Sequence, residues 1–500
     1  MSVRLIPNLP NDAGARSGED RNLAHTGYYE YQQARRKHWN GIVQDKPPTL
    51  GGYYNFHVRD VYRKLIPAGA AVLEIGCGTG RLLHELRPSV GVGVDFSSEA
   101  IKVAASTYPE LEFICADAHE LALGERRFDF IIFSDVINDV WDLQTILQSV
   151  HSHCKPGTRL IFSFFSQLWK PTLVLARRMK LARPMMLQNW FTAQDLRNLL
   201  ELTGYESLRA WPEMICPLEI PAISSFANKI LTKFPPFILF GLTNFLIARP
   251  APDPRDAQRG GPPSVSVVIP ARNEAGHIEQ LMARVPEMGG GTEIIFVEGN
   301  STDNTYDVIV ACAKEHPSRN CIVLKQSGKG KGDAVRKGFE AASGDILMIL
   351  DADMTVAPED LPRFYDALIS GRGEFVNGVR LVYPMDEQAM RLANLIGNKF
   401  FSWAFSWLLG QKIRDTLCGT KVLWTRDYRR LAANRAHFGD FDPFGDFDLL
   451  FGAAKLNLKI IEVPIRYRAR QYGTTNIQRW RHGLILLRMV IFAAKRLKFS

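Results

Sequence analysis

The stretch GDILMILDADM, residues 344–354, combines an apolar run with a closely spaced pair of acids. Five apolar residues, Ile346 to Leu350, predict a buried strand. Asp351 and Asp353 follow directly at its carboxyl end, the edge at which α/β sheets bind their ligands. Two carboxylates there suit a hard divalent cation, which prefers oxygen ligands. The D-x-D spacing recurs at 440/442 and 446/448, so the position after a strand carries the prediction.

Length and composition restrict the class of protein. A chain of 500 residues exceeds one ordinary core, so we expect at least two domains. The net charge of +9 suits phosphate-bearing ligands or an anionic membrane surface, and its dispersed basic residues argue against a nucleic-acid-binding role. Seven scattered cysteines without a C-x-x-C motif predict reduced thiols in the cytoplasm. The N-terminus lacks a signal-peptide pattern.

Transmembrane segments are not expected. No run reaches the roughly 20 apolar residues that span a bilayer. The nearest, 234–248, contains Pro235, Pro236 and Gly241, and it predicts a turn followed by a buried strand at 244–249.

The first half begins with a polar segment, 1–25, which we expect to be a mobile tail. Strands are predicted at 71–75, 91–94, 112–115, 128–133 and 159–165, with a turn at 155–157. Helical segments alternate with them, which predicts a doubly wound parallel sheet. The first strand runs into a G-x-G-x-G loop, and Arg81 stands where a dinucleotide fingerprint needs its last glycine. That spacing argues against a pyrophosphate cofactor.

Four pieces of this half resemble the class I S-adenosylmethionine-dependent methyltransferases: VLEIGCGTG (72–80), GVDFS (93–97), CADAHEL (115–121) and FDFIIFSDV (128–136). The resemblance implies a Rossmann-like domain over 26–250 that binds S-adenosylmethionine. It implies that glycines line the methionine end of the cofactor with an acid behind them, that a second acid holds the ribose, and that the next loops flank the adenine. The residues so implied are Glu74, Gly76, Gly78, Gly80, Asp95, Asp117, Ala118 and Asp135.

The methyl acceptor is not specified by the sequence. Methyl transfer is a displacement for which positioning can suffice. Asp135, Asp139, His151 and His153 are candidate bases, and a structural role is the alternative for each. The basic, Met/Trp-rich segment 168–190 is interpreted either as a cap over the acceptor pocket or as a helix packed on the sheet.

The segment APDPRDAQRGGPP, residues 251–263, predicts a linker. A second α/β pattern follows, with strands at 265–269, 293–297 and 321–325 before the D-x-D strand. The third leads into GKGKGD, residues 328–333, a loop whose backbone N–H groups and lysines suit phosphate.

The pieces of this half resemble the family 2 glycosyltransferases with a GT-A fold: VVIPARNE (267–274), VEGNSTDNT (297–305), GKGDAVRKGF (330–339), LDADM (350–354), DTLCGTKVLW (415–424) and 445–473. The resemblance covers 264–480 and lies closest to the branch that transfers sugars to polyprenyl phosphates. It implies inverting transfer from a nucleotide sugar, with Mg²⁺ or Mn²⁺ held by Asp351 and Asp353. The donor-binding residues so implied are Pro270, Arg272, Asn273, Glu274, Glu298, Lys329, Asp333, Asp351 and Arg470.

Asp446 and Asp448, at the start of an apolar helix, are the candidate catalytic bases for an acceptor hydroxyl. If the acceptor is a phosphate, no base is needed and these acids would orient it. The alternation of Arg466, Arg468 and Arg470 suits a diphosphate, with a solvated strand face as the alternative.

The chain departs from the family in two places. Glu298 and Gly299 stand where the family usually has two aspartates, which leaves the donor base open. Thr475 and Asn476 replace the usual Ser-Lys of the lipid-phosphate branch.

Two segments are candidates for contact with a membrane surface. Residues 391–409 carry polar residues on one helical face and aromatic residues on the other. Residues 481–500 predict a basic amphipathic helix, with Arg481, Arg488 and Lys495 seven residues apart on one side. Both suit a helix lying in a membrane interface, and packing against their own domain is the alternative.

We therefore predict a bifunctional cytoplasmic transferase at the cytoplasmic face of a membrane. One domain transfers sugar from a nucleotide sugar to a lipid-phosphate or glycan acceptor, and the other methylates a related product. Two alternatives stay open: one domain is catalytically silent and serves as a binding or targeting module, or the protein is a soluble glycosyltransferase with a small-molecule acceptor. The sequence does not specify the oligomeric state.

Overall fold

The computed structural model describes residues 18–44, 51–179, 185–186, 188–252, 261–380, 392–433, 447–466 and 479–498. The chain divides into two compact units, Met1–Ala251 and Pro252–Ser500. The division falls at the start of the predicted linker, of which residues 253–260 lie outside the described ranges.

Unit 1 is built on a seven-stranded sheet of order β3-β2-β1-β4-β5-β7-β6, in which β7 runs opposite to the other six strands. Its strands are β1 (Ala71–Ile75), β2 (Val90–Asp95), β3 (Glu112–Cys115), β4 (Phe128–Ser134), β5 (Cys154–Phe165), β6 (Tyr205–Glu213) and β7 (Thr243–Pro250). Its α-helices are α1 (Gly18–Gln44), α2 (Gly51–Leu65), α3 (Arg81–Glu85), α4 (Ser98–Thr107), α5 (Leu143–His151), α6 (Lys170–Arg178), α7 (Ala193–Leu202) and α8 (Ile223–Lys229). Short 3-10 helices are η1 (Ala118–Glu120), η2 (Ile137–Asp139), η3 (Gln167–Trp169), η4 (Leu231–Lys233) and η5 (Phe237–Phe240).

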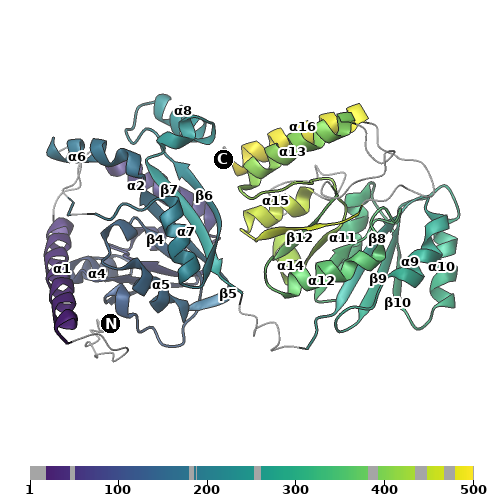
Figure 1. Ribbon diagram of the computed structural model, residues 1–500, viewed down its shortest axis with the longest axis horizontal. Coiled ribbons are helices and arrows are strands. Elements are labelled where there is room, and N and C mark those ends of the chain that lie inside the picture. The colour runs from purple at the N-terminus through teal and green to yellow at the C-terminus, as the bar shows by residue number, and fades with distance from the viewer. Residues whose placement is uncertain are drawn as a thin grey trace. The chain divides into compact units, whose positions relative to one another are not determined.

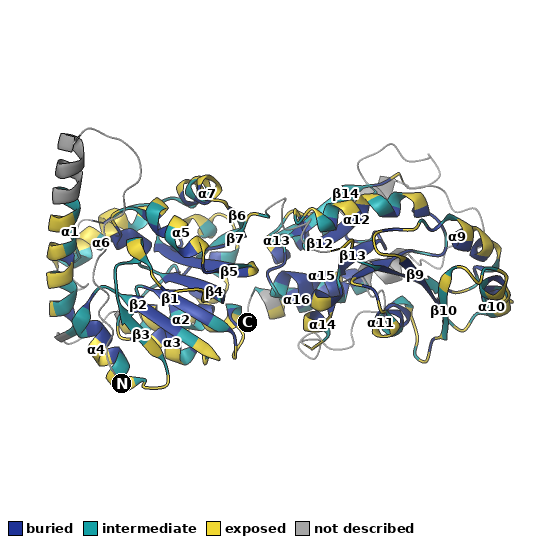
Figure 2. Cartoon of the chain, turned by 90° about the horizontal axis from the view of Figure 1, so that it is seen from below, coloured by how far each residue is buried: buried dark blue, intermediate teal, exposed yellow. Residues whose placement is uncertain are grey.

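Alternate strand residues of unit 1 face two apolar layers. Leu73 and Ile75 belong to the layer with α5 and α7, whereas Val72 belongs to the layer with α2 and α3. Successive side chains of a strand point to opposite faces, which explains why these strands read as nearly continuous apolar runs. Figure 2 shows the strands buried between helices whose outer faces are exposed.

Two expectations for unit 1 need correction. Helix α1 begins at Gly18, so residues 18–25 are helical rather than part of a tail. Residues 155–157 lie within β5, where the register with β4 shifts and the strand bulges, so the predicted turn is an irregularity of the strand. Helix α6 has no fully buried residue, and it contacts the apolar layer of α2 and α3 through the partly buried Leu173.

Unit 2 has a seven-stranded sheet of order β10-β9-β8-β11-β13-β12-β14, with β13 antiparallel to β11 and β12. Its strands are β8 (Val265–Ala271), β9 (Thr292–Glu298), β10 (Asn320–Lys325), β11 (Ile346–Ile349), β12 (Phe375–Val379), β13 (Lys421–Trp424) and β14 (Ile460–Pro464). Its helices are α9 (Ile278–Arg284), α10 (Thr305–Glu315), α11 (Lys331–Ala341), α12 (Leu361–Ile369), α13 (Leu392–Leu409), α14 (Thr425–Ala433), α15 (Phe447–Lys455) and α16 (Arg479–Leu497), with η7 (Ala275–His277) and η8 (Pro358–Asp360). The predicted class, two α/β domains, is confirmed (Figure 1).

The two segments predicted to meet a membrane are helices α13 and α16, which lie side by side (Figure 1). Phe405 of α13 and Leu486, Met489 and Ala493 of α16 are buried in the core of unit 2. Part of each apolar face is thus used for packing within the unit. Among the described residues, no helix combines the length and the apolarity needed to cross a membrane.

Candidate functional sites

The carboxyl ends of parallel strands in unit 2 bring four predicted loops together. The loop after β8 joins the loop after β9, because Ser301 Oγ accepts a hydrogen bond from Asn273 N at 3.0 Å and Asn273 Oδ1 accepts one from Thr302 N at 2.8 Å. Gln326 N, after β10, donates to the carbonyl of Glu298 at 2.8 Å. Strand β11 lies on the other side of β8. The predicted donor loops therefore share one edge of the sheet.

The D-x-D pair is connected to the glycine-lysine loop by an ion pair. Lys331 Nζ, at the start of α11, lies 2.6 Å from Asp351 Oδ1, and both side chains are about a quarter exposed. Asp353 Oδ1 accepts hydrogen bonds from Thr355 N at 3.2 Å and Thr355 Oγ1 at 2.8 Å, which orient its carboxylate. The sequence analysis placed Lys331 in a loop suited to phosphate but did not predict its pair with Asp351, and it did not single out Thr355.

A glycine distant in sequence contacts this ion pair. A Cβ placed on Gly419 would overlap the Asp351 carboxylate and the Lys331 ammonium. Gly419 belongs to the DTLCGT segment, whose Asp415 is buried and paired with Arg380 at 2.7 Å. Burial raises the pKa of Asp415, but the Arg380 charge and its hydrogen bonds outweigh burial and lower that pKa below its usual range. The buried pair fixes the loop that carries Gly419.

Other predicted donor residues have contacts within their own loops. Asp333 Oδ2 accepts a hydrogen bond from Gly328 N at 2.9 Å and so closes the glycine-lysine loop. The buried Glu274 lies 2.9 Å from His277 Nδ1, and the buried Glu298 accepts from Ser301 N at 2.5 Å. Pro270 is half-buried, and Arg272 and Lys329 are exposed.

The two candidate bases differ in how far the structure describes them. Asp448 is half-buried in the first turn of α15, whereas Asp446, Arg468 and Arg470 lie outside the described residues. Arg466 follows β14 and is exposed.

The pair Asp351 and Asp353 suits a metal that takes its remaining ligands from the substrate. Within the described residues, no three His, Cys, Asp or Glu side chains gather closely enough to hold an ion by themselves. Mg²⁺ is commonly held by one or two carboxylates together with substrate phosphates and water. The donor set therefore fits a divalent ion that arrives with a diphosphate.

In unit 1, the G-x-G-x-G loop opens a space next to the backbone. Gly76, Gly78 and Gly80 all have positive φ angles, of 73°, 51° and 75°. A Cβ would overlap Val136 at Gly76 and Phe113 at Gly80, but at Gly78 it would meet nothing within 4 Å. Glycine is thus required at all three positions, and the open side of Gly78 lets a ligand approach closely.

An acid lies behind this loop and another beside it. Glu74 is buried, and its Oε2 atom has no hydrogen-bond partner among the described residues. Burial raises the pKa of Glu74 well above its usual range. Asp95 accepts hydrogen bonds from Gly78 N at 2.9 Å and Ser97 N at 2.8 Å, and burial raises its pKa despite them. An open glycine backbone, a buried carboxyl with a free oxygen and an acid at the end of β2 fit a ligand that joins an amino acid to a nucleoside, such as S-adenosylmethionine.

Asp117 is already hydrogen-bonded by groups of the protein itself. Its Oδ1 atom accepts from His119 N at 2.9 Å, and its Oδ2 atom accepts from Tyr28 Oη at 2.8 Å and from Gln32. Burial acts to raise the pKa of Asp117, but the bonds from His119 and Tyr28 outweigh it and hold the pKa at about 2. Ala118 begins the short helix η1 directly after it. An adenine at this position would have to share Asp117 with these groups.

Helix α1 contacts this edge of the sheet at several points that the sequence did not predict. Arg35 pairs with Asp139, Trp39 Nε1 donates to Asp139 Oδ2 at 2.5 Å, and Tyr31 Oη donates to the Asp139 carbonyl at 2.5 Å. Asn40 Oδ1 accepts from Ser97 Oγ at 2.6 Å. Asp139 is therefore an anchor for α1, and this pairing accounts for its burial.

Asp135 lies at the end of β4 in a left-handed conformation, φ 56°. Its carboxylate accepts hydrogen bonds from Tyr54 Oη at 2.9 Å and Ser163 Oγ at 2.8 Å, and burial raises its pKa. His151 and His153 lie at the opposite edge of the sheet. The His153 backbone carbonyl accepts a hydrogen bond from Phe128 N, at the start of β4, and the His151 ring packs on Tyr205, at the start of β6. The structure thus argues against both histidines as bases at the cofactor edge.

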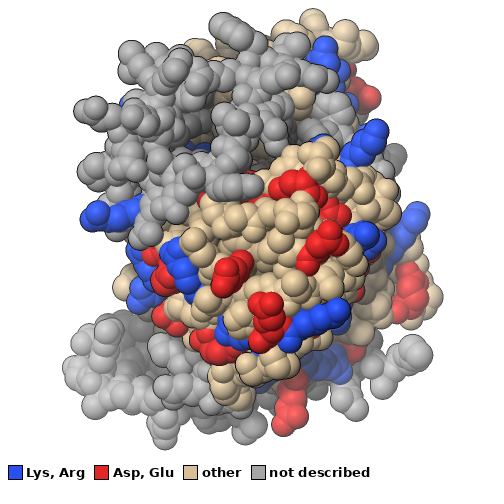
Figure 3. Space-filling view, turned by 90° about the vertical axis from the view of Figure 1, so that its right-hand side faces the viewer, with Lys and Arg blue, Asp and Glu red and all other residues tan. Residues whose placement is uncertain are grey.

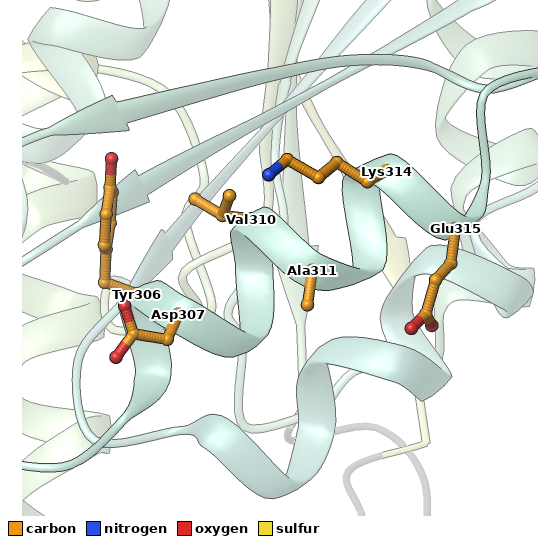
Figure 4. Close-up of a pocket in the computed structure, with 6 residues that line it drawn as sticks. All are labelled: Tyr306, Asp307, Val310, Ala311, Lys314 and Glu315. Carbon is orange, nitrogen blue, oxygen red and sulfur yellow. The ribbon is translucent and has the colours of Figure 1, made fainter.

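One hollow in unit 2 lies along helix α10. It is lined by Tyr306, Asp307, Val310, Ala311, Lys314 and Glu315, all from α10 (Figure 4). Side chains from a single helix do not enclose a substrate, so we do not treat this hollow as the active site. Acidic and basic side chains are interspersed on the face turned toward the viewer in Figure 3, without the basic stripe typical of nucleic-acid binding.

Comparisons with known proteins relate each unit to a protein family. Residues 266–435 match the family described as "Glycosyl transferase family 2", and residues 53–210 match the family described as "Methyltransferase domain". The "Glycosyltransferase AglJ" of Haloferax volcanii is 29% identical over 227 residues, which cover 45% of this chain and 70% of that protein. The "Undecaprenyl-phosphate 4-deoxy-4-formamido-L-arabinose transferase" of Pectobacterium carotovorum is 27% identical over 217 residues, which cover 42% of this chain and 62% of that protein.

A solved structure is similar to part of the chain at a lower sequence identity. The glucosyl-3-phosphoglycerate synthase of Mycobacterium tuberculosis is 20% identical, with 49% of this chain and 83% of that chain covered and a TM-score of 0.36. The two family matches fall one in each compact unit. The chain is therefore a fusion of a methyltransferase domain with a family 2 glycosyltransferase domain.

Proposed function

We propose that unit 2 transfers a sugar, with inversion, from a nucleotide-sugar donor to a polyprenyl-phosphate or glycan acceptor. We propose further that unit 1 methylates a related product with S-adenosylmethionine. The observation that carries the first proposal is the D-x-D pair at the carboxyl end of β11, joined through Lys331 to the glycine-lysine loop. A curated relative whose name includes undecaprenyl phosphate supports a lipid-phosphate acceptor.

In this proposal Asp351 and Asp353 hold Mg²⁺ or Mn²⁺. Such an ion, when bound, neutralises the charge that develops on the leaving nucleoside diphosphate. The backbone N–H groups at the start of α11 and the exposed Lys329 face anionic groups of the donor, as helix N-termini and lysines commonly do. Asp448, with Asp446, accepts the proton of an acceptor hydroxyl, or orients the acceptor if that group is a phosphate.

In unit 1 the chain supplies binding and orientation. Gly76, Gly78 and Gly80 form the loop that faces the methionine end of the cofactor, which approaches the backbone at the open side of Gly78, with Glu74 behind it. Asp95 accepts hydrogen bonds from the ribose hydroxyls, and Asp117 and Ala118 flank the adenine. Asp135 stays bound to Tyr54 and Ser163 and shapes the floor of the site.

We also propose that the protein works at the cytoplasmic face of a membrane, because polyprenyl phosphate, one of the two proposed acceptors, is a lipid. The exposed Phe400, Trp403, Leu487 and Ile491 of α13 and α16 are available for such a surface.

The test is a thermal-shift screen of nucleotide sugars with Mn²⁺ or Mg²⁺, followed by transfer of radiolabelled sugar to polyprenyl phosphate. A ligand at about 100 times its dissociation constant stabilises by about 2.7 kcal/mol. We expect a metal-dependent shift with one nucleotide base, and a transfer rate about two to three orders of magnitude lower in Asp353→Ala. A separate titration with S-adenosylmethionine should lose its shift in Gly78→Asp. Transfer at the wild-type rate in Asp353→Ala would disprove the metal assignment, and an unchanged titration of Gly78→Asp would disprove the cofactor site.

A further inference from the structure

Two segments of the methyltransferase unit expose an unusual number of large apolar side chains. Four lie in 168–179 and nine in 218–240, which is more than half of the 23 such side chains exposed in the described residues. The most exposed on each element include Leu168 (65%), Leu175 (57%), Ile223 (59%), Phe226 (53%), Leu239 (64%) and Phe240 (54%). Scattered apolar side chains on a surface are ordinary, but a contiguous group marks a binding surface.

These side chains form one surface, which we call the α6–η5 surface: residues 166–179 and 214–242. Trp169 Nε1 donates a hydrogen bond to the Phe240 carbonyl at 2.9 Å, and Ser166 N donates to the Leu242 carbonyl at 2.7 Å. Helix α8, η4 and η5 follow one another directly along the chain. Figure 1 draws α6 and α8 toward the same side of unit 1.

The α6–η5 surface lies at the edge of the sheet that carries the candidate cofactor site. Strand β7 runs antiparallel to both β5 and β6, so β5 and β6 point the same way. Segment 166–179 leaves the carboxyl end of β5, and segment 214–242 leaves the carboxyl end of β6. The loops that carry Gly78 and Asp95 leave the same edge.

The charges of this surface are almost all of one sign. The two segments contain five basic residues and a single acid, Glu219. Lys170, Arg178 and Lys229 are exposed, whereas Lys233 is paired with Glu213. Exposed Leu, Ile and Phe beside Lys and Arg are typical of elements that lie in the interface of an anionic membrane. Protein–protein interfaces are instead depleted in lysine.

We propose that the α6–η5 surface docks unit 1 on an anionic lipid bilayer. The short elements α6, α8 and η5 insert their apolar side chains at the level of the headgroups, and the exposed lysines and arginine meet lipid phosphates. This surface consists of elements of unit 1, whereas the sequence pattern suggested α13 and α16 of unit 2 for a membrane. If the proposed methyl transfer is correct, docking delivers a lipid-linked acceptor to the cofactor edge; the docking itself does not depend on that activity.

The test is co-sedimentation of the full chain with vesicles of phosphatidylcholine containing phosphatidylglycerol, or of phosphatidylcholine alone. The variant is Ile223→Asp with Leu239→Asp, two exposed side chains on different elements. We expect partitioning onto anionic vesicles to fall by at least about tenfold, because burying one large apolar side chain changes an equilibrium constant by roughly that factor. Lys229→Glu with Arg178→Glu should weaken binding to anionic vesicles only.

The matched control is Leu202→Asp, which replaces a side chain that is 73% exposed at the end of α7, outside the surface. It should bind vesicles like the wild type, and melting curves should show that all variants fold. Wild-type binding by the Ile223/Leu239 variant would overturn the proposal. The proposal would also be overturned if the Ile223/Leu239 variant bound vesicles normally but changed its mass in sedimentation velocity. The surface would then belong to an interface between copies of the chain.

Discussion

Replacing Gly419 by alanine should separate the geometry of the D-x-D site from the stability of the fold. The added Cβ would stand 2.7 Å from Asp351 Cγ and overlap the carboxylate oxygen that faces it. The φ angle of Gly419 is not in the left-handed region, so alanine causes no backbone strain there. Asp351 must therefore turn away, and its pair with Lys331 must open.

The cost to stability is small for a physical reason. Overpacking a rigid core costs about 1–3 kcal/mol, but the atoms that give way here are the ends of two side chains about a quarter exposed. We expect Gly419→Ala to cost about 1 kcal/mol or less. Sugar transfer should fall by about two to three orders of magnitude, the scale of losing one electrostatic element of a transition state.

The assay is transfer of radiolabelled sugar, with Mn²⁺ affinity and melting temperature measured on the same samples. Gly261→Ala is the control, because a Cβ at Gly261 meets nothing within 4 Å. Gly419→Ala added to Asp351→Ala should cause little further loss, since both act through one carboxylate. Transfer by Gly419→Ala within about threefold of wild type, in a folded protein, would refute this reasoning.

Three further predictions concern stability. Because burial raises the pKa of Glu74, its ionisation opposes folding increasingly as the pH rises above 4.5. Glu74→Gln should therefore have the melting temperature of the wild type at pH 4 and a higher melting temperature than the wild type at pH 8. Burial acts to raise the pKa of Glu213, but Lys233 and His57 outweigh it and hold that pKa at about 2. Glu213→Gln should therefore cost roughly 2–4 kcal/mol of stability at pH 7. The difference in stability between this variant and the wild type should shrink as the pH falls from 4.5 towards 2. Arg380→Ala leaves Asp415 buried without its charge partner and should cost about 3–5 kcal/mol in chemical denaturation, and a cost below about 1 kcal/mol would contradict the pairing.

The sequence by itself determined the order of elements and the loops that matter. The predicted strands match the observed ones to within two residues at each end, except that β5 begins five residues before the predicted position 159. The agreement arises because burial on both faces of a parallel sheet requires consecutive apolar residues. The glycines after β1 and the acids after β11 were also predicted, since a positive φ angle and a carboxylate at a strand end are properties of single positions. These local signals predicted both domains and the linker between them.

Tertiary structure alone decided which distant groups meet. Lys331 pairs with Asp351 and Gly419 packs against that pair because crossover connections bring three loops to one sheet edge, and no pattern along the chain encodes such a meeting. In the same way, Asp139 was a candidate base by sequence and is the anchor of helix α1 in the fold. The apolar residues of 218–240 do not differ in hydropathy from those of a buried segment, because hydropathy does not specify which other side chains pack against a residue. Their exposure is seen only in the folded structure.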